Sequence, residues 1–434
     1  MKVSEMDSNA EPDMTVIIYT AEIRGGSARY ICEAAIAASA ADQKIVLICP
    51  PNFEFMQQLT SSGRVQIELT AAKTTKLNSS PLFKVGEYMH ICWKAGCALR
   101  RYARNSGRRV VHFNHPGRLM FVVPLMLLAH RLRMGVIFTV HDPIPHKEPD
   151  RWLEARLERF LMLAACRVAD RLIVHTRDGQ HQLMRVCHLP SSKFAVIPHG
   201  AFEIQSAPVP ASSLPLPLKI LVFGMLRENK GIHLAIEAVQ LLNAREERVQ
   251  LLIAGNVESG SEQLYWEECK RKIAVKPRGI VFREEFIAEN EIPSIFANCH
   301  IALLPYTQFY SQSGVAVMAL SNARPLLATR SGGITELVEA SGGGLLLAEA
   351  TASAVRDGIE EALRIGIPNL ARMGMESWAY VREHYSWSAL AAVTALVYEA
   401  ASRNRDVRGL PLRSESTANS GETSPDSAGK AAGA

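Results

Sequence analysis

The feature that most constrains the fold is an alternation of short apolar runs with helical stretches, which occurs twice along the chain. In the first half, β-branched runs lie at 16–19, 45–48, 110–113, 136–140 and 172–175. In the second half, apolar runs lie at 220–223, 251–254, 280–282, 301–304, 326–329 and 345–347. Apolar strands that are joined by helices form parallel sheets covered on both faces. The sequence therefore predicts an α/β protein with two doubly wound parallel-sheet domains.

A proline-rich segment separates the two halves. Residues 206–217 carry four prolines, which exclude a helix and disfavour a central strand. We predict a first domain at 14–205, this linker, and a second domain at 218–375. Helices at 376–403 are expected to cross back to the first domain. The N-terminal stretch 1–13 is expected to be flexible, and the Ser-, Gly- and Ala-rich tail 404–434 to be disordered.

Composition excludes several other classes of protein. With 434 residues, 48% hydrophobic and 21% charged, the chain is long and apolar enough for two globular cores. Its eight cysteines form no Cys-x-x-Cys pair, which favours reduced thiols over a disulfide frame or a zinc site. The polar start lacks the pattern of a signal peptide, and the longest apolar run, 121–129, is too short to span a membrane. We therefore expect a cytoplasmic protein, either soluble or peripheral on the inner face of the plasma membrane.

Two junctions between strand and helix in the second half suit a phosphate group. Arg227 and Lys230 lie in the loop that follows the strand 220–223 and precedes a helix, and cations at a helix N-terminus favour a bound anion. Ser313 and Gly314 precede another helix, where a serine caps the helix and a glycine leaves the amides accessible. A solvated charged loop and an ordinary helix cap are the alternative interpretations. The third junction, 331–336, is more typical of a simple helix start.

The order of these segments resembles that of retaining family-four glycosyltransferases of the GT-B fold, over about residues 14–402. The second half carries GMLRENKG, LLIAGN and SQSGVAVMALSNARPLLATRSGGITELV, and the first half carries IRGGSARYICEAA, VVHFNHPG, FTVHDPIPH, ADRLIVHT and FAVIPHG. The resemblance implies two Rossmann-like domains that face a cleft. It also implies transfer of a hexose from a UDP- or GDP-linked donor to an oligosaccharide or polyprenyl-linked glycan. Such enzymes commonly serve bacterial exopolysaccharide or other surface polysaccharide biosynthesis.

The resemblance assigns the donor-binding residues to the second half. Lys230 matches the lysine that binds the donor phosphates, and Arg227 substitutes for an arginine usually found near Met225. The family's two glutamates fall at Tyr310 and Met318, so the chain looks like a subset that carries Gln-Ser-Gly-Val instead. We expect Gln312 to contact a sugar hydroxyl, and the amides of Ser313, Gly314 and Val315 to bind phosphate. No Asp-x-Asp is present, so neither a metal nor another cofactor is expected.

In the first half, the resemblance points to residues that follow strands. Gly25 and Gly26 form a turn that related enzymes place against the donor phosphates, and the carboxyl end of a sheet is where ligands bind in such folds. His141 looks like the active-site histidine beside the anomeric carbon. His112 and His115 are candidates on the acceptor side. His199 stands where an asparagine is commoner and is expected to be structural.

Two other functions remain open. A sugar-nucleotide epimerase can share this architecture, but it needs a pair of carboxylates in the cleft. A non-catalytic protein could keep only the nucleotide-sugar pocket. A dehydrogenase is disfavoured because no Gly-x-Gly-x-x-Gly follows a strand.

The segment 84–133 concentrates positive charge. It carries ten basic residues and one acidic residue, whereas the whole chain has a net charge of +5. Apolar side chains, among them Trp93, interleave with the basic ones. This pattern favours an anionic membrane surface as a partner. A solvated helix face beside a buried apolar helix is the alternative interpretation. Nucleic acid is disfavoured, because no recognition motif accompanies the arginines.

Overall fold

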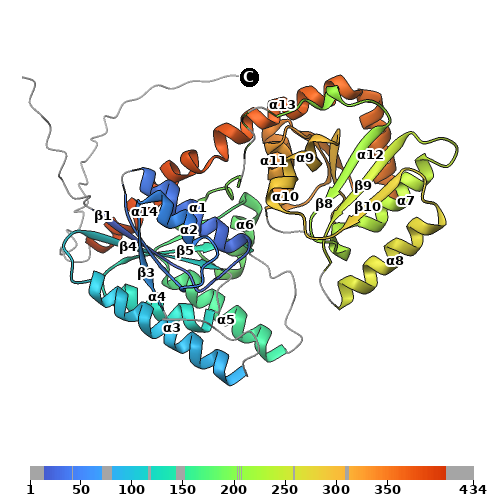
Figure 1. Ribbon diagram of the computed structural model, residues 1–434. Coiled ribbons are helices and arrows are strands. Elements are labelled where there is room, and N and C mark those ends of the chain that lie inside the picture. Colours follow the sequence, from blue (N-terminus) through green and yellow to red (C-terminus); the bar gives the residue numbers. More distant parts are fainter. Residues whose placement is uncertain are drawn as a thin grey trace, which may run out of the picture.

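The computed structural model describes residues 14–41, 43–70, 81–115, 119–142, 152–202, 204, 206, 208–257, 260–307 and 312–406. The predictions for 1–13 and for the tail beyond 406 lie outside these residues. Two parallel sheets, each flanked by helices on both faces, form two domains (Figure 1).

The first sheet has seven strands in the order β3-β2-β1-β4-β5-β6-β7. Five of them confirm predicted runs, whereas β3 and β7 were not predicted. β3 is an edge strand whose polar residues interrupt the apolar pattern, and β7 is only three residues long. The strands are β1 (Met14–Tyr19), β2 (Lys44–Cys49), β3 (Val65–Leu69), β4 (Arg108–His115), β5 (Gly135–Val140), β6 (Arg171–Val174) and β7 (Phe194–Val196). The helices are α1 (Gly26–Ala40), α2 (Met56–Ser62), α3 (Pro81–Tyr102), α4 (Leu119–Arg131), α5 (Trp152–Val168) and α6 (Arg177–Cys187), followed by the short 3₁₀ helix η1 (Ser191–Lys193).

The second sheet has six strands in the order β10-β9-β8-β11-β12-β13, and all six were predicted. They are β8 (Leu218–Phe223), β9 (Val249–Gly255), β10 (Ile280–Glu284), β11 (Ile301–Leu304), β12 (Leu326–Thr329) and β13 (Gly344–Leu347). The helices are α7 (Ile232–Leu242), α8 (Ser261–Val275), α9 (Ile292–Ala297), α10 (Gly314–Ser321), α11 (Gly332–Ser341), α12 (Ala352–Ile365), α13 (Ile367–His384) and α14 (Trp387–Asp406). Three 3₁₀ helices accompany them: η2 (Ala211–Ser213), η3 (Glu228–Lys230) and η4 (Glu289–Glu291).

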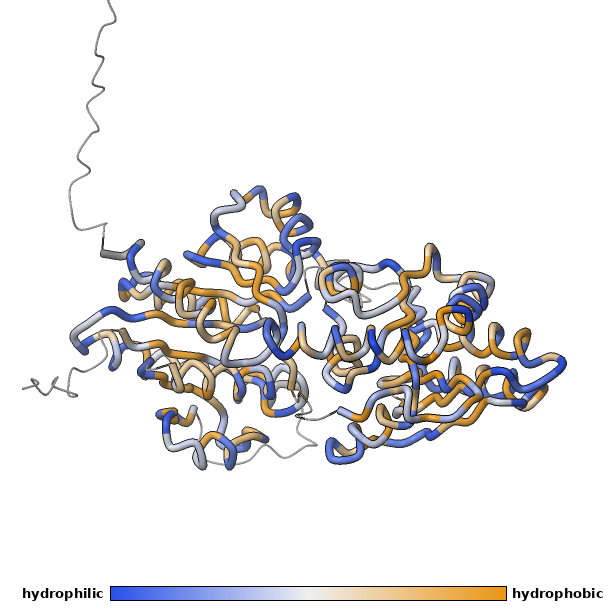
Figure 2. The backbone as a smooth tube through the Cα atoms, turned by 90° about the horizontal axis from the view of Figure 1, so that it is seen from above, coloured by the Kyte–Doolittle hydropathy of each residue, from blue (hydrophilic) through white to orange (hydrophobic). Residues whose placement is uncertain are grey.

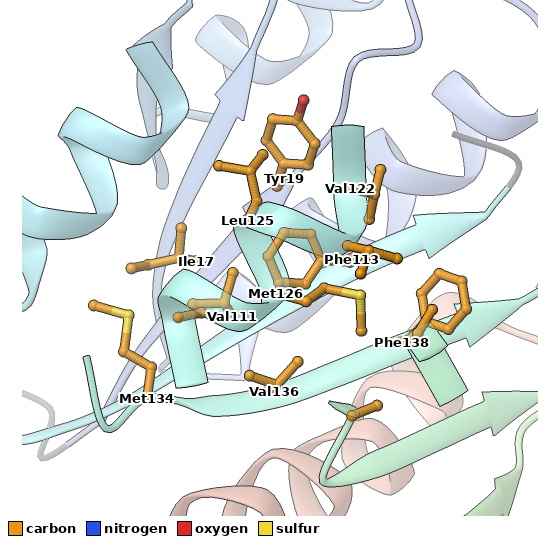
Figure 3. Packing of buried hydrophobic residues seen from close by; sticks show 14 of the residues in the cluster. Ile17, Tyr19, Val111, Phe113, Val122, Leu125, Met126, Met134, Val136 and Phe138 are labelled. Carbon is orange, nitrogen blue, oxygen red and sulfur yellow. The ribbon is translucent and has the colours of Figure 1, made fainter. Parts of the chain in front are cut away.

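Each sheet is buried between two layers of apolar side chains. In the first domain, residues of β1, β4 and β5 pack against α4, as Ile17, Phe113 and Met126 do in Figure 3. Apolar segments accordingly run through the interior of both domains, while many of the outer turns are hydrophilic (Figure 2). The apolar run 121–129 lies within α4, and its residues Val122, Val123, Leu125, Met126 and Ala129 face this core. Among the helices that the structure describes, none combines the length and the apolar character needed to cross a membrane.

The C-terminal helices divide between the domains. α13 packs against α10 and α11 of the second domain, and α14 packs against α1 and β5 of the first (Figure 1). The crossing predicted for 376–403 therefore begins later than expected, after His384. The approach of α14 to the sheet is close, since a side chain at Gly135 would come within 2.8 Å of the Ala401 carbonyl oxygen.

The strand order reverses at one place in each sheet, between β1 and β4 and between β8 and β11. Segments that leave the carboxyl ends of such strands diverge to opposite faces of the sheet and open a crevice, where ligands bind in doubly wound folds. The Gly25–Gly26 turn follows β1, the Arg227–Lys230 loop follows β8, and the start of α10 follows β11. The fold thus brings these predicted site residues to the two switch points.

A buried arginine fastens the interdomain segment to the second domain. The Arg324 side chain is fully buried, and its Nε donates to the Phe296 carbonyl at 2.7 Å. Nη1 donates to the carbonyl of Val209 at 2.7 Å, and Nη2 to that of Ala297 at 3.1 Å. Since Phe296 and Ala297 end α9, the cation lies at the negative end of that helix.

We expect Arg324→Met to destabilise the protein by about 3 kcal/mol or more, because several carbonyls would lose a charged donor in a site that water does not reach. The midpoint of thermal unfolding should fall by roughly 2–4 °C for each kcal/mol of unfolding free energy that is lost. Arg330→Met is the matched control, because that exposed side chain makes a surface ion pair with Glu339. Equal midpoints for the two variants would contradict the role of Arg324.

Candidate functional site

Three neighbouring strands of the first sheet each lead into a histidine. His141 follows β5, His175 follows β6, and His199 lies three residues beyond β7. His175 Nε2 lies 2.7 Å from His141 Nδ1, and the ring centroids of His175 and His199 are 5.6 Å apart. Tyr30 of α1 contacts all three rings, with centroid separations of 4.7–5.6 Å. The predicted active-site histidine is therefore one member of a cluster.

Burial keeps two of these histidines neutral. Desolvation, with a smaller contribution from the neighbouring His199, lowers the pKa of His175 to about 3. Desolvation also lowers the pKa of His199 to about 4. Both rings are hydrogen-bonding groups without charge at neutral pH. His175, like His141, stands at the end of a predicted strand, and this is the signal by which the sequence could have indicated it.

The Gly25–Gly26 turn has the predicted form. Gly25 has φ +85°, a backbone conformation that favours glycine, and it precedes the first residue of α1. Its N–H donates to Glu54 Oε2 at 2.9 Å. A Cβ built on either glycine would meet no atom within 4 Å, so the space in front of the turn is open.

In the second domain, the cationic loop and the start of α10 lie side by side. The Lys230 ammonium lies 3.8 Å from the centroid of the Tyr306 ring, and the Tyr306 hydroxyl lies 3.3 Å from Ser313 Oγ. Ser313 caps α10 by accepting from the Ala316 N–H, as predicted from the sequence. A Cβ on Gly224 at the end of β8 would lie 3.3 Å from Val315.

A close approach between the backbones of Gly231 and Pro305 stabilises this arrangement. Gly231 has φ +64°, and a Cβ there would lie 2.0 Å from the Pro305 carbonyl oxygen. Only glycine fits, so the loop with Arg227 and Lys230 is pressed against the end of β11. The structure therefore joins two of the predicted phosphate-binding features, the cations and the N-terminus of α10, in one place.

Gln312 has a different position from the one predicted. Its Nε2 donates to the His199 carbonyl at 3.0 Å, and its Oε1 accepts from the His199 N–H at 2.7 Å. The side-chain amide thus pairs with the backbone N–H and C=O of His199, in the segment that leaves β7. The contact with a sugar hydroxyl stays a prediction, and in this structure both polar atoms link the two domains.

Glu336 forms a second link that the sequence did not reveal. Its carboxylate accepts from the backbone N–H groups of Arg177 and Asp178, at 3.0 and 2.9 Å, at the start of α6. A carboxylate at a helix N-terminus is favourable because the unpaired N–H groups and the helix dipole attract negative charge. The sequence pointed only to a helix start at 331–336, since a contact 158 residues away leaves no local pattern.

An open pocket lies between the domains. Arg29 of α1 and the segment 199–202 line one side, and Glu289, Gly314 and Met318 line the other. Arg29 and Glu289 form an ion pair across it. Met318, which aligns with an acidic position of the family, faces this pocket, whereas Tyr310 lies outside the described residues.

One of the two acceptor-side candidates on β4, His112, has a structural position. His112 lies inside the strand and not at its end, and it is buried. Its Nδ1 lies 3.0 Å from the Tyr398 hydroxyl and its Nε2 lies 2.7 Å from Thr139 Oγ1, so both nitrogens are satisfied within the core. Burial lowers its pKa to about 4. His112 is therefore a structural histidine that joins α14 to the sheet. His115 ends β4, and its side chain lies outside the described part.

Comparison with known proteins connects this arrangement to glycosyltransferases. Residues 24–201 match the family model described as "Glycosyltransferase Family 4", and residues 217–364 match that described as "Glycosyl transferases group 1". Across the described residues, no group of three or more His, Cys, Asp or Glu side chains could hold a metal ion.

Relatives are similar over parts of the chain. One is the "GDP-mannose:glycolipid 4-beta-D-mannosyltransferase" of Xanthomonas campestris, 24% identical over 44% of this chain and 49% of that protein. Another is the "Putative colanic acid biosynthesis glycosyltransferase WcaL" of Escherichia coli, 28% identical over 38% of this chain and 41% of that protein. The chain thus spans about half the length, or less, of the curated relatives that it matches.

Solved structures show the fold. HepE from Anabaena, in complex with UDP, superimposes with a TM-score of 0.67 at 16% identity, covering 89% of this chain and 99% of that one. The same protein has been solved with UDP-glucose, with a TM-score of 0.64. The prediction of a two-domain GT-B fold is therefore confirmed.

We expect Glu336→Ala to weaken the contact between the domains. Losing a charged acceptor worth ~1.5–3 kcal/mol should speed hydrogen exchange at the Arg177 and Asp178 amides by roughly ten- to a hundredfold. Amide exchange followed by NMR or mass spectrometry measures this directly. Glu339→Ala on the same helix is the control, since Glu339 pairs with Arg330 at the surface. If both variants exchange alike at these amides, Glu336 is not a link.

Proposed function

We propose that this chain, which carries a glycosyltransferase family 4 domain followed by a group 1 glycosyltransferase domain, transfers a hexose from a UDP- or GDP-linked donor to a glycan or polyprenyl-linked acceptor. The transfer is retaining and requires no metal, and it serves bacterial exopolysaccharide or other surface polysaccharide biosynthesis in the cytoplasm. The observation that carries this proposal is the meeting of Lys230, from the loop that also holds Arg227, with the start of α10 at the switch point of the second sheet.

The chemistry required there is charge stabilisation. When the bond between sugar and diphosphate breaks, negative charge develops on the phosphate oxygens. Lys230, Arg227 and the exposed amides at the start of α10 supply fixed positive charge and hydrogen-bond donors for it. Such groups act without reorganising during the reaction. In this mechanism the leaving phosphate helps to deprotonate the acceptor.

The names of similar proteins support the substrate classes without choosing among them. The Xanthomonas relative is named for GDP-mannose and a glycolipid, the Escherichia coli relative for colanic acid biosynthesis, and the Anabaena structures hold UDP or UDP-glucose. We therefore keep both UDP- and GDP-sugars as donors.

The test is incubation of the protein with labelled UDP-, GDP- and ADP-sugars and a glycolipid acceptor, with and without EDTA. Transfer that survives EDTA supports the proposal, and complete loss that Mg²⁺ restores contradicts metal independence. Conversion of the donor sugar into its epimer without transfer would indicate an epimerase. Binding of a nucleotide sugar without turnover would indicate a non-catalytic protein.

NMR of the new glycosidic linkage decides the stereochemistry. An α-linked product from an α-linked donor is retention, whereas the β-linkage named for the Xanthomonas relative would require inversion of such a donor.

We expect Lys230→Ala to reduce kcat/KM for the donor by roughly ten- to a hundredfold, because a charged contact with phosphate is worth ~1.5–3 kcal/mol. The thermal midpoint should barely change, since the side chain is only half-buried in a loop. Lys270→Ala is the control, because Lys270 on the distant helix α8 pairs with Glu267 of the same helix and with Glu284 at the end of β10. Wild-type efficiency in Lys230→Ala would remove Lys230 from the site.

Peripheral attachment to an anionic membrane forms part of the proposal. The helices α3, α4 and α5 lie side by side over one face of the first sheet (Figure 1). Large apolar side chains stand exposed on their outer surfaces: Met89, Trp93, Met120, Leu127, Leu157 and Phe160. Basic side chains are exposed among them: Lys94, Arg100, Arg101, Arg104, Arg131, Arg156 and Arg159. Anionic lipids attract such cations by ~1 kcal/mol each near the surface, and apolar side chains add insertion into the interface.

Not every arginine of the basic segment belongs to this surface. Arg108 lies 3.4 Å from Ser402 and 3.9 Å from Glu399, and Arg109 donates to the Ala103 carbonyl at 3.0 Å. Both are at the start of β4 and are half-buried, so they are poor choices for a test of lipid binding. The exposed cations of α3 are better.

We expect sedimentation with phosphatidylglycerol vesicles to exceed sedimentation with neutral vesicles, and to fall at high salt because salt screens charge. Replacing Lys94, Arg100 and Arg104 with Ser should reduce binding. The control replaces Arg271, Arg364 and Arg372 of the second domain with Ser, an equal change in charge at exposed sites. Equal binding to both vesicle types, or equal loss in both triple variants, would contradict this surface.

A further inference from the structure

An ion pair across the pocket between the domains brings a cation of the first domain into the cleft. Arg29 lies three residues after Gly26, the first residue of α1, and residues three apart are neighbours on one face of a helix. Its Nη1 donates to the Glu289 carboxylate of η4 in the second domain. Of the residues that line this pocket in the described part of the chain, Arg29 is the one arginine or lysine.

The Arg29 guanidinium has more donors than this ion pair uses. It carries five N–H groups in a planar fork, a shape that fits a carboxylate or a phosphate. Within the described residues, its hydrogen bond is the one from Nη1 to Glu289. The Phe202 ring lies against the guanidinium, with 4.6 Å between Arg29 Cζ and the ring centroid. This contact orients the cation without using its N–H groups.

Glu289 holds Arg29 weakly. The Glu289 side chain is 59% exposed, whereas that of Arg29 is 18% exposed. An ion pair with such an exposed member contributes little free energy, because water and salt compete for the charges. A diphosphate carries more negative charge than one carboxylate and offers more acceptor oxygens. A diphosphate in the pocket can therefore replace Glu289, while Phe202 keeps the guanidinium in position.

The walls of the pocket beside Arg29 leave room for an anion. Gly314, the first residue of α10, lines the same pocket, and a Cβ built there would meet no atom within 4 Å. Gly26, on the Arg29 face of α1, is open in the same way. The pocket thus places a cation of the first domain opposite the helix start that carries the proposed phosphate site.

We infer that Arg29 is a donor-binding residue of the first domain, and that Glu289 occupies its guanidinium until the diphosphate of a nucleotide sugar replaces the carboxylate. This inference rests on the proposed function, because the diphosphate is that of the donor. Arg29 then faces Lys230 and Arg227 from the other side of the cleft. Binding of the donor exchanges a direct contact between the domains for a contact through the ligand.

Titration calorimetry of the full chain with UDP and GDP tests the exchange. Arg29→Gln should weaken binding of the nucleoside diphosphate by roughly ten- to a hundredfold, since a charged contact with phosphate is lost. Glu289→Gln should strengthen binding by about two- to fivefold, because Arg29 no longer has to leave a carboxylate. Unchanged binding in Arg29→Gln would overturn the inference, as would unchanged or weaker binding in Glu289→Gln. Because Glu289 is exposed, its variant provides a test even if Arg29→Gln fails to fold.

The double variant separates exchange from simple repulsion, since Glu289→Gln also removes a negative charge near the ligand. In the Arg29→Gln background, Glu289→Gln should give no gain in affinity, because there is no ion pair to break. An equal gain in both backgrounds would mean that Glu289 only repels the anion, and the exchange would be wrong. Uridine and guanosine, which lack phosphate, should bind wild type and Arg29→Gln alike. If they lose as much affinity as UDP and GDP, Arg29 does not act on the phosphates.

Two matched variants control for charge and position. Arg64→Gln removes an exposed cation that directly precedes β3, at the amino end of the first sheet and therefore away from the cleft. Glu291→Gln removes a carboxylate of the same 3₁₀ helix as Glu289, but one that pairs with Arg283. Neither should change nucleotide affinity. Effects as large in these controls as in Arg29→Gln and Glu289→Gln would contradict a specific role for the ion pair.

Lys230→Ala distinguishes this inference from the proposed function. If a nucleotide binds, and Lys230→Ala weakens binding while Arg29→Gln does not, the proposed donor site stands and the role of Arg29 fails. If neither UDP nor GDP binds the wild-type protein, the proposed function and the inference fail together.

Discussion

The site depends on two side chains of the second domain that bind the backbone of the first. Gln312 pairs with the peptide of His199, and Glu336 accepts from the first amides of α6. Both contacts use backbone groups that follow the carboxyl ends of β6 and β7. An ion pair between Arg29 and Glu289 adds a further polar link.

The two domains supply different chemistry to this cleft. The second contributes permanent positive charge, from Arg227 and Lys230, beside the dipole of α10. The first contributes two neutral histidines, since burial lowers the pKa values of His175 and His199 to about 3 and 4. It also contributes Arg29, which forms an ion pair with Glu289 of the second domain.

Several residues show where motif matching succeeds and where it fails. Ser313 was predicted as a cap and is one, since capping depends on the residue and its immediate neighbours. Gln312 was predicted to contact a sugar hydroxyl, and its side chain links to the backbone of His199, 113 residues away. His112 was placed at a strand end, yet the strand continues to His115, and Tyr398 of α14 lies against the ring. Both contacts involve a partner that is distant in the sequence.

The sequence by itself determined the two parallel sheets, because apolar runs and helical periodicity are local properties that act residue by residue. It also determined which loops carry glycine, cations and helix caps at the carboxyl ends of strands. Only the tertiary structure decided which of these loops meet, that α14 returns to the first sheet, and that three strand ends assemble His141, His175 and His199 around Tyr30. The reason is physical: the partner of a hydrogen bond, and the burial that sets a pKa, depend on packing between segments far apart in the chain.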